Sequence, residues 1–178
     1  MSTSIPLRRG CNHSYTPTTL SFAELIGELT TVMGVQPGEM TRFIARCTNL
    51  LRGHPGANGW APLLNKGSGR GVAATYTRGD LLHFYVAMHL NLAGVSPAVA
   101  VPVTLRALPG FAEAQIQRQD YYRNTEPRPI SLRLSLPSAL GNLATSVRLM
   151  IPEQMVMDAI GISWRDSDSD SDPKGVAQ

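Results

Sequence analysis

Hydrophobic and polar positions recur with a helical period in the stretch 33–53. Apolar side chains return there every three or four residues, which places them on one face of a helix. Pro37 suits the first helical position, and Gly53 suits the position just past the end. The apolar positions are Met40, Phe43, Ile44, Cys47, Leu50 and Leu51. We therefore expect a helix with one face in the core, entered through a tight turn.

The segment before this helix has the same apolar spacing. Ser21 and Glu24 form the sequence signature of a capping box, and Leu20 and Leu25 occupy the flanking staple positions. The apolar positions that follow are Phe22, Leu25, Ile26, Leu29, Val32 and Met33. Two such helices joined by residues 34–36 fit a helix-turn-helix that presents its second helix outward, although an αα-hairpin of any small helical protein fits equally.

The polar face of the second helix carries side chains that are suited to nucleic-acid recognition. Arg42, Arg46 and Asn49 follow one another at i, i+4 and i+7, so they lie on one line. Arg and Asn are the residues that bond bidentately to guanine and adenine edges in the major groove. A solvated face of an ordinary surface helix has the same composition, so the flanking sequence has to decide between the two interpretations.

A long glycine- and proline-rich segment, residues 53–71, follows this helix. Loops of this length in small domains are usually functional. Trp60, Leu63 and Leu64 can anchor its middle, and the tip at 65–71 carries Lys66 and Arg70 among glycines. Val72, Ala74 and Tyr76 then alternate as a short strand does. A basic tip followed by a strand predicts a wing that contacts phosphates, and neither a nucleotide-binding nor a dinucleotide-binding glycine motif is present.

Two further helices are expected after the wing. Thr77 is the N-cap of the first and Asp80 lies in its first turn. Its apolar positions are Leu81, Tyr85, Met88 and Leu92, and Gly94 ends it. A second, short helix should start at Ser96-Pro97 and run to about Leu108, with a break or kink at Pro102.

The last third of the chain has a strand pattern. A polar helical segment at 111–124 and an extended connector at 126–129 precede two alternating runs. The apolar positions are Ile130, Leu132, Leu134 and Leu136 in one run and Val147, Leu149 and Ile151 in the other. A lone two-stranded ribbon is marginal in water, so this face should pack on the head of the same chain or on the ribbon of a second chain. A short helix, 152–160, closes the ordered part.

Charge is distributed unevenly between the body and the tail. Residues 1–150 carry fourteen Lys or Arg and seven Asp or Glu, a net charge of +7, whereas residues 151–178 carry two and six, a net charge of −4. A basic body favours a polyanionic partner such as nucleic acid. The Asp-Ser repeat from Asp166 fits a solubilising tail, or one that competes with nucleic acid for the basic face.

No pattern in the sequence indicates an enzyme, a cofactor or a membrane segment. Cys11 and Cys47 are the only cysteines, which favours a reduced, cytoplasmic protein without disulfides. His83 and His89 are six residues apart, so they point to different sides of a helix and cannot share a metal. We expect no catalytic residue, no metal site, no signal peptide and no transmembrane helix.

The order of these elements resembles the MerR-like winged helix-turn-helix of bacterial and phage regulators, over about residues 20–108. The turn Gly34-Val35-Gln36-Pro37 matches the entry to the recognition helix of that family. Arg70 and Tyr76 match the arginine of the wing and the aromatic residue after it, Thr77 and Asp80 match the next cap, and Gly94-Val95-Ser96 matches the cap that follows. The helix arginine of the family falls at Thr41, one residue before Arg42, and an insertion carrying Trp60 precedes the wing.

The resemblance and the residue patterns together predict a mainly α protein with a small β component. We expect a flexible lead at 1–18, a winged helix-turn-helix at 19–108, a C-terminal helix and ribbon for oligomerisation at 109–165, and a disordered acidic tail at 166–178. The residues expected to contact DNA are Thr41, Arg42, Arg46, Asn49, Lys66, Arg70, Tyr76 and Arg78. Those expected to form the oligomer interface are Ile130, Leu132, Leu134, Leu136, Val147, Leu149 and Ile151.

The expected function is sequence-specific binding of double-stranded DNA by a homodimer that regulates transcription. Two alternatives remain open. One is a phage DNA-packaging recognition subunit, which would use the same reading head on a larger ring and meet a packaging partner. The other is a non-catalytic adaptor whose basic helix binds an acidic protein surface.

Overall fold

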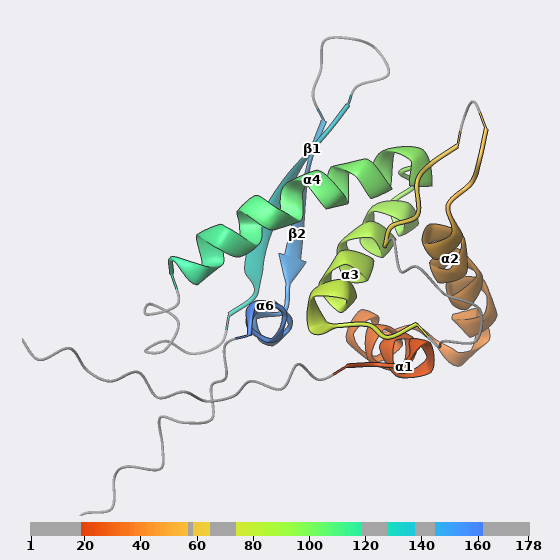
Figure 1. The fold of residues 1–178 in the computed structure, drawn as a ribbon, viewed down its shortest axis with the longest axis horizontal. Coiled ribbons are helices and arrows are strands. Elements are labelled where there is room, and N and C mark those ends of the chain that lie inside the picture. The colour runs from red at the N-terminus through yellow and green to blue at the C-terminus, as the bar shows by residue number, and fades with distance from the viewer. Residues whose placement is uncertain (1–18, 57–58, 65–73, 119–127, 138–144, 162–178) are drawn as a thin grey trace, which may run out of the picture.

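The computed structural model describes residues 19–56, 59–64, 74–118, 128–137 and 145–161. Within these ranges the chain is mainly helical, with one small two-stranded antiparallel sheet (Figure 1), as the sequence predicts. The helices are α1 (Phe22–Met33), η1 (Pro37–Glu39), α2 (Met40–Arg52), α3 (Arg78–Leu92), α4 (Pro97–Ile116) and α6 (Glu153–Ile160). The strands are β1 (Ile130–Leu136) and β2 (Thr145–Ile151).

The capping box predicted at Ser21 is present, and the predicted N-cap Thr77 forms a second capping box with Asp80. The backbone N–H of Ser21 donates to Glu24 Oε2 at 2.7 Å, and the N–H of Glu24 donates to Ser21 Oγ at 3.3 Å. Hydrogen bonds to the Glu24 carboxyl from the Ser21 backbone N–H and, to a smaller extent, from the Ser21 side chain hold its pKa below its usual value. Thr77 and Asp80 make the same pair of bonds at the start of α3, at 2.7 and 3.2 Å. Each box satisfies two backbone N–H groups that would otherwise lack partners within the helix, so it fixes where its helix begins.

The turn between α1 and α2 also follows the sequence pattern. Gly34 ends α1 in the left-handed region, with φ of 64°, which glycine adopts without steric cost. Pro37 is the first residue of the single 3₁₀ turn η1, and the α-helical hydrogen bonds begin only at Met40. The second helix therefore has the predicted limits with a tighter first turn, and its end at Arg52 is followed by Gly53.

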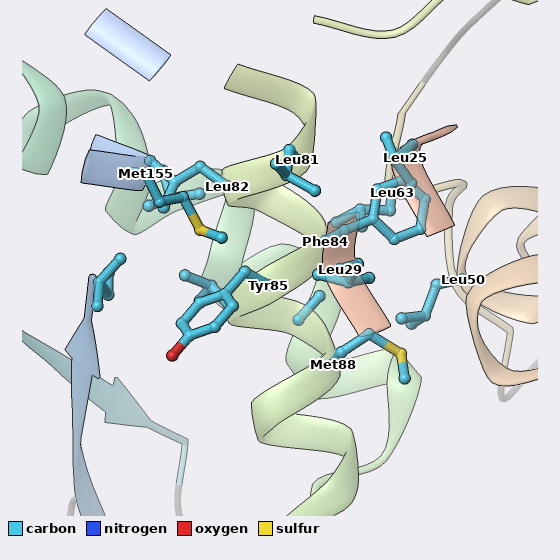
Figure 2. Packing of buried hydrophobic residues seen from close by; sticks show 14 of the residues in the cluster. Leu25, Leu29, Leu50, Leu63, Leu81, Leu82, Phe84, Tyr85, Met88 and Met155 are labelled. Carbon is cyan, nitrogen blue, oxygen red and sulfur yellow. The ribbon is translucent and has the colours of Figure 1, made fainter. Parts of the chain in front are cut away.

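Helix α3 is the centre of the fold. Its buried residues are Leu81, Leu82, Phe84, Tyr85, Val86, Ala87, Met88 and Leu90, which surround the helix axis instead of forming one stripe. A helix that is apolar all round is buried on all sides. Figure 2 shows Phe84 among Leu25, Leu29 and Leu63, while Tyr85 and Met155 lie on another side of α3. Helices α1 and α2 pack on one side of α3, and α4 and α6 pack elsewhere on it.

Helix α4 runs unbroken where the sequence predicted a short helix, a proline break and a second helical segment. It contains both Pro102 and Pro109. The two prolines are seven residues apart and exposed, so they lie on the solvent face, where the carbonyl groups that lose a hydrogen-bond partner face water. Packing of the opposite face holds the helix together; its buried residues are Ala100, Val101, Thr104, Leu108 and Gln115. Of the predicted break or kink at Pro102, the break is absent, and the boundary predicted between residues 108 and 109 falls inside α4.

We expect the Pro109→Ala variant to be more stable than the wild type by about 1–3 kcal/mol. Proline costs about 3 kcal/mol relative to alanine inside a helix, and the proline restraint on the unfolded chain offsets about 0.4–1 kcal/mol of that. The matched control is Pro97→Ala, because Pro97 occupies the first turn of α4, where proline is favourable. Urea unfolding measures both variants. If both variants change the free energy of unfolding by the same amount, then Pro109 does not destabilise α4 as an interior proline should.

The ribbon packs on its own chain. Strands β1 and β2 are antiparallel, with Ile130 opposite Ile151 and Leu134 opposite Val147. Its apolar face lies against α4, and the Tyr85 hydroxyl on α3 donates to the Met150 carbonyl at 3.1 Å. Leu134 is 1% exposed and Ile151 is 0% exposed. The ribbon therefore completes the core, which is the other arrangement that the alternating pattern allows.

This packing corrects the predicted oligomer interface. Ile130, Leu132, Leu134 and Ile151 are buried within one chain, so they have no apolar surface left to offer a second copy. The remaining three predicted residues, Leu136, Val147 and Leu149, are half-buried and pack against the same core. A hydrophobic face can be covered only once, and here the covering surface comes from the same chain.

Helix α6 fixes the end of the described chain onto α3. Met155, Val156 and Met157 are buried against α3 and α4. Glu153, in the first turn of α6, is buried, and its Oε2 accepts a hydrogen bond from the Arg128 backbone N–H. The short C-terminal helix is thus confirmed, and it joins the connector before β1 to the core. The predicted lead, 1–18, and the predicted acidic tail, 166–178, lie outside the described residues.

In the part of the chain that the structure describes, no helix combines the length and the apolar character needed to span a membrane.

Candidate nucleic-acid interface

Helix α2 has one anchored face and one open face. Phe43, Cys47 and Leu50 are buried toward α3, and the Cys47 side chain is 0% exposed. Burial raises the pKa of the Cys47 thiol to about 12, so this thiol stays protonated and serves as a core side chain. The backbone N–H of Leu63 donates to the Leu50 carbonyl at 2.8 Å, which ties the following loop to the end of the helix. These contacts hold the helix axis in one orientation.

The open face carries the residues expected to read DNA. Thr41, Arg42, Arg46 and Asn49 are all exposed. Arg42, Arg46 and Asn49 follow at i, i+4 and i+7 on a regular α-helix, so their side chains leave the helix on one side. Arg52, also exposed, continues this face into the last turn and was not among the predicted residues. The sequence could have predicted this, because Arg52 comes three residues after Asn49 and such residues lie on the same face of a helix.

Helix α2 carries a net positive charge. It contains Arg42, Arg46 and Arg52 and no acidic residue, and Glu39 precedes it in η1. Among the described residues no carboxylate forms an ion pair with Arg42 or Arg46. As far as the described residues show, the guanidinium groups are therefore available to an external acceptor such as a base edge or a phosphate.

Ile44 departs from the predicted apolar stripe. Its side chain is 37% exposed, although the pattern placed it in the core. The buried line of α2 runs through Phe43, Cys47 and Leu50, and Ile44 lies one residue, about 100°, further round the helix. Val32, near the end of α1, is 43% exposed for a similar reason. Both apolar side chains remain at the surface of α1 and α2.

The first part of the loop after α2 is ordered by a small bridge. The backbone groups of His54 and Trp60 exchange hydrogen bonds of 3.0 and 2.9 Å, and their rings stack with centroids 5.3 Å apart. Gly53 has φ of 66°, and an added Cβ there would lie 2.7 Å from the Trp60 carbonyl oxygen, so glycine is needed. Trp60, Leu63 and Leu64 pack on the core, as the sequence predicts for an anchored loop. Residues Lys66 and Arg70 of the predicted wing tip lie outside the described residues.

Tyr76 belongs to the core, and we leave it out of the interface. Its side chain is 4% exposed and packs between Phe22 and Phe84. Its backbone pairs with Leu20 in a single antiparallel bridge, with hydrogen bonds of 2.7 and 2.8 Å. Burial, together with the charge of Asp80, raises the pKa of the Tyr76 phenol. An alternating pattern indicates which residues share a face, and here that face is the interior.

Arg78 has a structural partner. Its guanidinium forms an ion pair with the Glu28 carboxylate, which links the first turn of α3 to α1. Both side chains are partly exposed, so the pair lies at the surface. Arg78 would reach DNA only by giving up this contact, and we therefore assign it to holding α1 on α3.

The described residues contain no cluster suited to a metal. No group of three or more His, Cys, Asp or Glu side chains converges within the described ranges. His83 Nδ1 lies 2.8 Å from the Gly79 carbonyl oxygen. The His89 ring contacts the Tyr85 ring edge-on, at 4.4 Å between centroids, and burial lowers the pKa of His89. The two imidazoles serve separate local contacts.

Comparison with known proteins gives no match to this chain. Neither a protein-family model, nor a curated protein sequence, nor a solved structure corresponds to this chain. Any functional assignment for this protein therefore rests on the residues and contacts described above.

Proposed function

We propose that this protein binds double-stranded DNA sequence-specifically and acts as a regulator of the winged helix-turn-helix type, with α2 in the major groove. The observation that supports this is the exposed line Arg42, Arg46 and Asn49 on a helix whose opposite face is fixed in the core. An α-helix fits the width of the major groove of B-DNA. Arg bonds bidentately to guanine and Asn to adenine, so this line supplies donors and acceptors for three base edges.

The rigid packing of α2 favours sequence-specific recognition of bases over non-specific electrostatic binding of DNA. A side chain that contributes to specificity has to arrive at the base edge in a defined register. The buried residues Phe43 and Leu50 and the hydrogen bond from Leu63 to Leu50 restrict rotation and sliding of α2 on α3. The capping box of α1 and the Arg78–Glu28 pair do the same for the preceding helix.

Binding selection tests this function directly. The full chain is incubated with a library of random duplexes, the bound fraction is amplified and sequenced, and affinities for the enriched and an unrelated duplex are then measured with heparin as competitor. We expect an enriched motif and a specific complex that survives heparin. A protein that recognises an acidic protein surface would bind heparin and all duplexes alike, and that result would contradict the proposal.

The predicted wing gives a separate expectation. Lys66→Ala and Arg70→Ala should weaken binding to enriched and unrelated duplexes by the same factor, because phosphate contacts are independent of sequence. Each lost phosphate contact should lower the salt slope of the binding constant by about 0.9. Titrations at several salt concentrations measure the slope. A slope equal to that of the wild type in both variants would exclude these residues from the backbone contact.

A further inference from the structure

The outward face of the ribbon is polar and basic. Alternation along β1 and β2 turns every second side chain away from the core. The outward residues are Ser131, Arg133, Ser135, Ser146, Arg148 and Met150, and all of them are exposed. They stand in register as Ser131 with Met150, Arg133 with Arg148, and Ser135 with Ser146. We call these six residues the outer ribbon face.

Two like charges meet at the middle of the outer ribbon face. Arg133 and Arg148 are directly opposite each other across the antiparallel pair, where Cβ atoms lie about 4.5–5.5 Å apart. Like charges in this arrangement repel and destabilise a ribbon. Within the described ranges neither guanidinium has a carboxylate partner, and the sequence 128–152 contains three Arg and no Asp or Glu. Neither the described residues nor the sequence of the two strands and their loop therefore supplies a carboxylate that pairs with these arginines.

We propose that Arg133 and Arg148 together bind a phosphate group of the DNA backbone, at a site separate from that of α2. This inference rests on the function proposed above. Two guanidinium forks that start from adjacent strands can converge on the oxygens of one phosphate, and each fork bonds an oxyanion through parallel N–H groups. The hydroxyls of Ser135 and Ser146 form the next cross-strand pair and are further donors to phosphate.

The position of the ribbon separates this contact from base reading. Figure 1 shows α2 on one side of α3 and the ribbon on the other, where Tyr85 of α3 holds β2 through the Met150 carbonyl. The outer ribbon face therefore lies away from α2, so a phosphate bound there belongs to a part of the DNA that α2 does not read. Phosphate contacts position a protein on DNA without selecting sequence. The ribbon should thus add affinity and footprint length and leave the sequence preference to α2.

The first test is the salt dependence of duplex binding by the full chain. The double variant Arg133→Gln with Arg148→Gln should lower the salt slope by about 0.9, which is the value for the loss of one phosphate contact. Its affinities for enriched and unrelated duplexes should fall by the same factor. The control is Arg106→Gln with Arg118→Gln, which removes the same charge from exposed positions on and just after α4. The control should retain the wild-type slope.

A second variant separates binding from stability. Arg133→Glu places a carboxylate opposite Arg148 and turns the repelling pair into a cross-strand ion pair. We expect its thermal midpoint to equal or exceed that of the wild type, while its affinity for duplex DNA falls at least as far as in the double glutamine variant. A purely structural role for the arginines would move stability and affinity in the same direction.

The outcomes distinguish this inference from the function on which it rests. A ribbon variant with the wild-type slope, or with a loss no larger than that of the Arg106 and Arg118 control, overturns the phosphate site. If binding is then lost only in Arg42 and Arg46 variants, the proposed function stands without the ribbon contact. A wild-type chain that shows no saturable binding to any duplex overturns both proposals.

Discussion

Replacing both Arg42 and Arg46 by alanine should lower the affinity for an enriched duplex by at least about thirtyfold. A good bidentate contact to a base is worth about 1–3 kcal/mol, and about 1.4 kcal/mol corresponds to tenfold in affinity. The fold should be unaffected, because both side chains are exposed and have no ion-pair partner among the described residues. Circular dichroism checks the fold, and competition against an unrelated duplex measures the loss of discrimination.

The control for this prediction is Arg106→Ala with Arg118→Ala, which changes the net charge equally and leaves α2 intact. This control should lose little discrimination between the enriched and unrelated duplexes. If the α2 variant and the control lose the same affinity, and both keep the sequence preference, then α2 attracts DNA without reading it. The same result would assign base recognition to another part of the chain.

Ending the chain at residue 128 should abolish cooperative folding. This truncation removes seven buried side chains of the core: Ile130, Leu132, Leu134, Ile151, Met155, Val156 and Met157. Burial of one such side chain contributes roughly 1.5–3 kcal/mol, so the total lost is on the order of 10–20 kcal/mol, against a typical stability of about 5–15 kcal/mol. We expect the far-ultraviolet dichroism of the truncated chain to lose its cooperative thermal transition.

A point substitution tests the same packing in the intact chain. Leu134→Ala should reduce the free energy of unfolding by about 2–5 kcal/mol, because its side chain is 1% exposed between the ribbon and the helices. Ser135→Ala, at the neighbouring exposed position, is the control and should change it by less than about 0.5 kcal/mol. The unfolding midpoint of Leu134→Ala should not depend on protein concentration. It would depend on concentration if this face were a dimer interface.

Local sequence rules predicted the start of each helix and the existence of the ribbon. The capping boxes at Ser21 and Thr77 act through neighbours three residues apart, so the sequence contains all of their information. The alternation at Ile130–Leu136 likewise predicted a half-buried strand. The same alternation does not specify the surface that buries it, and our prediction of a second copy there was wrong because the same chain covers this face.

The unbroken α4 was missed because a local rule was applied without knowledge of the buried face. Pro102 and Pro109 weaken any helix locally, but both fall on the side of α4 that faces solvent. Which side is buried depends on where α3 and the ribbon lie. Tertiary packing therefore outweighed the cost of the two prolines. This outcome could be known only from the arrangement of the helices and the ribbon in the core.

Some features of the candidate site could likewise be predicted from local sequence, and others could not. Exposure of Arg42, Arg46 and Asn49 follows from the helical period, which is a local property. The burial of Tyr76 between Phe22 and Phe84 and the pairing of Arg78 with Glu28 depend on contacts between separate helices. The opposition of Arg133 and Arg148 requires the strand register, which the two alternating runs alone do not fix.

The most direct test of base reading by α2 is the affinity of the wild-type chain for its enriched duplex when 7-deazaguanine replaces guanine. This change removes the N7 acceptor from the major groove and leaves Watson–Crick pairing intact, so it affects only a protein that reads guanine there. We predict a loss of affinity for the substituted duplex in the wild type and a much smaller loss in the variant with alanine at 42 and 46. Equal affinities of the wild type for the two duplexes would contradict base reading by this helix.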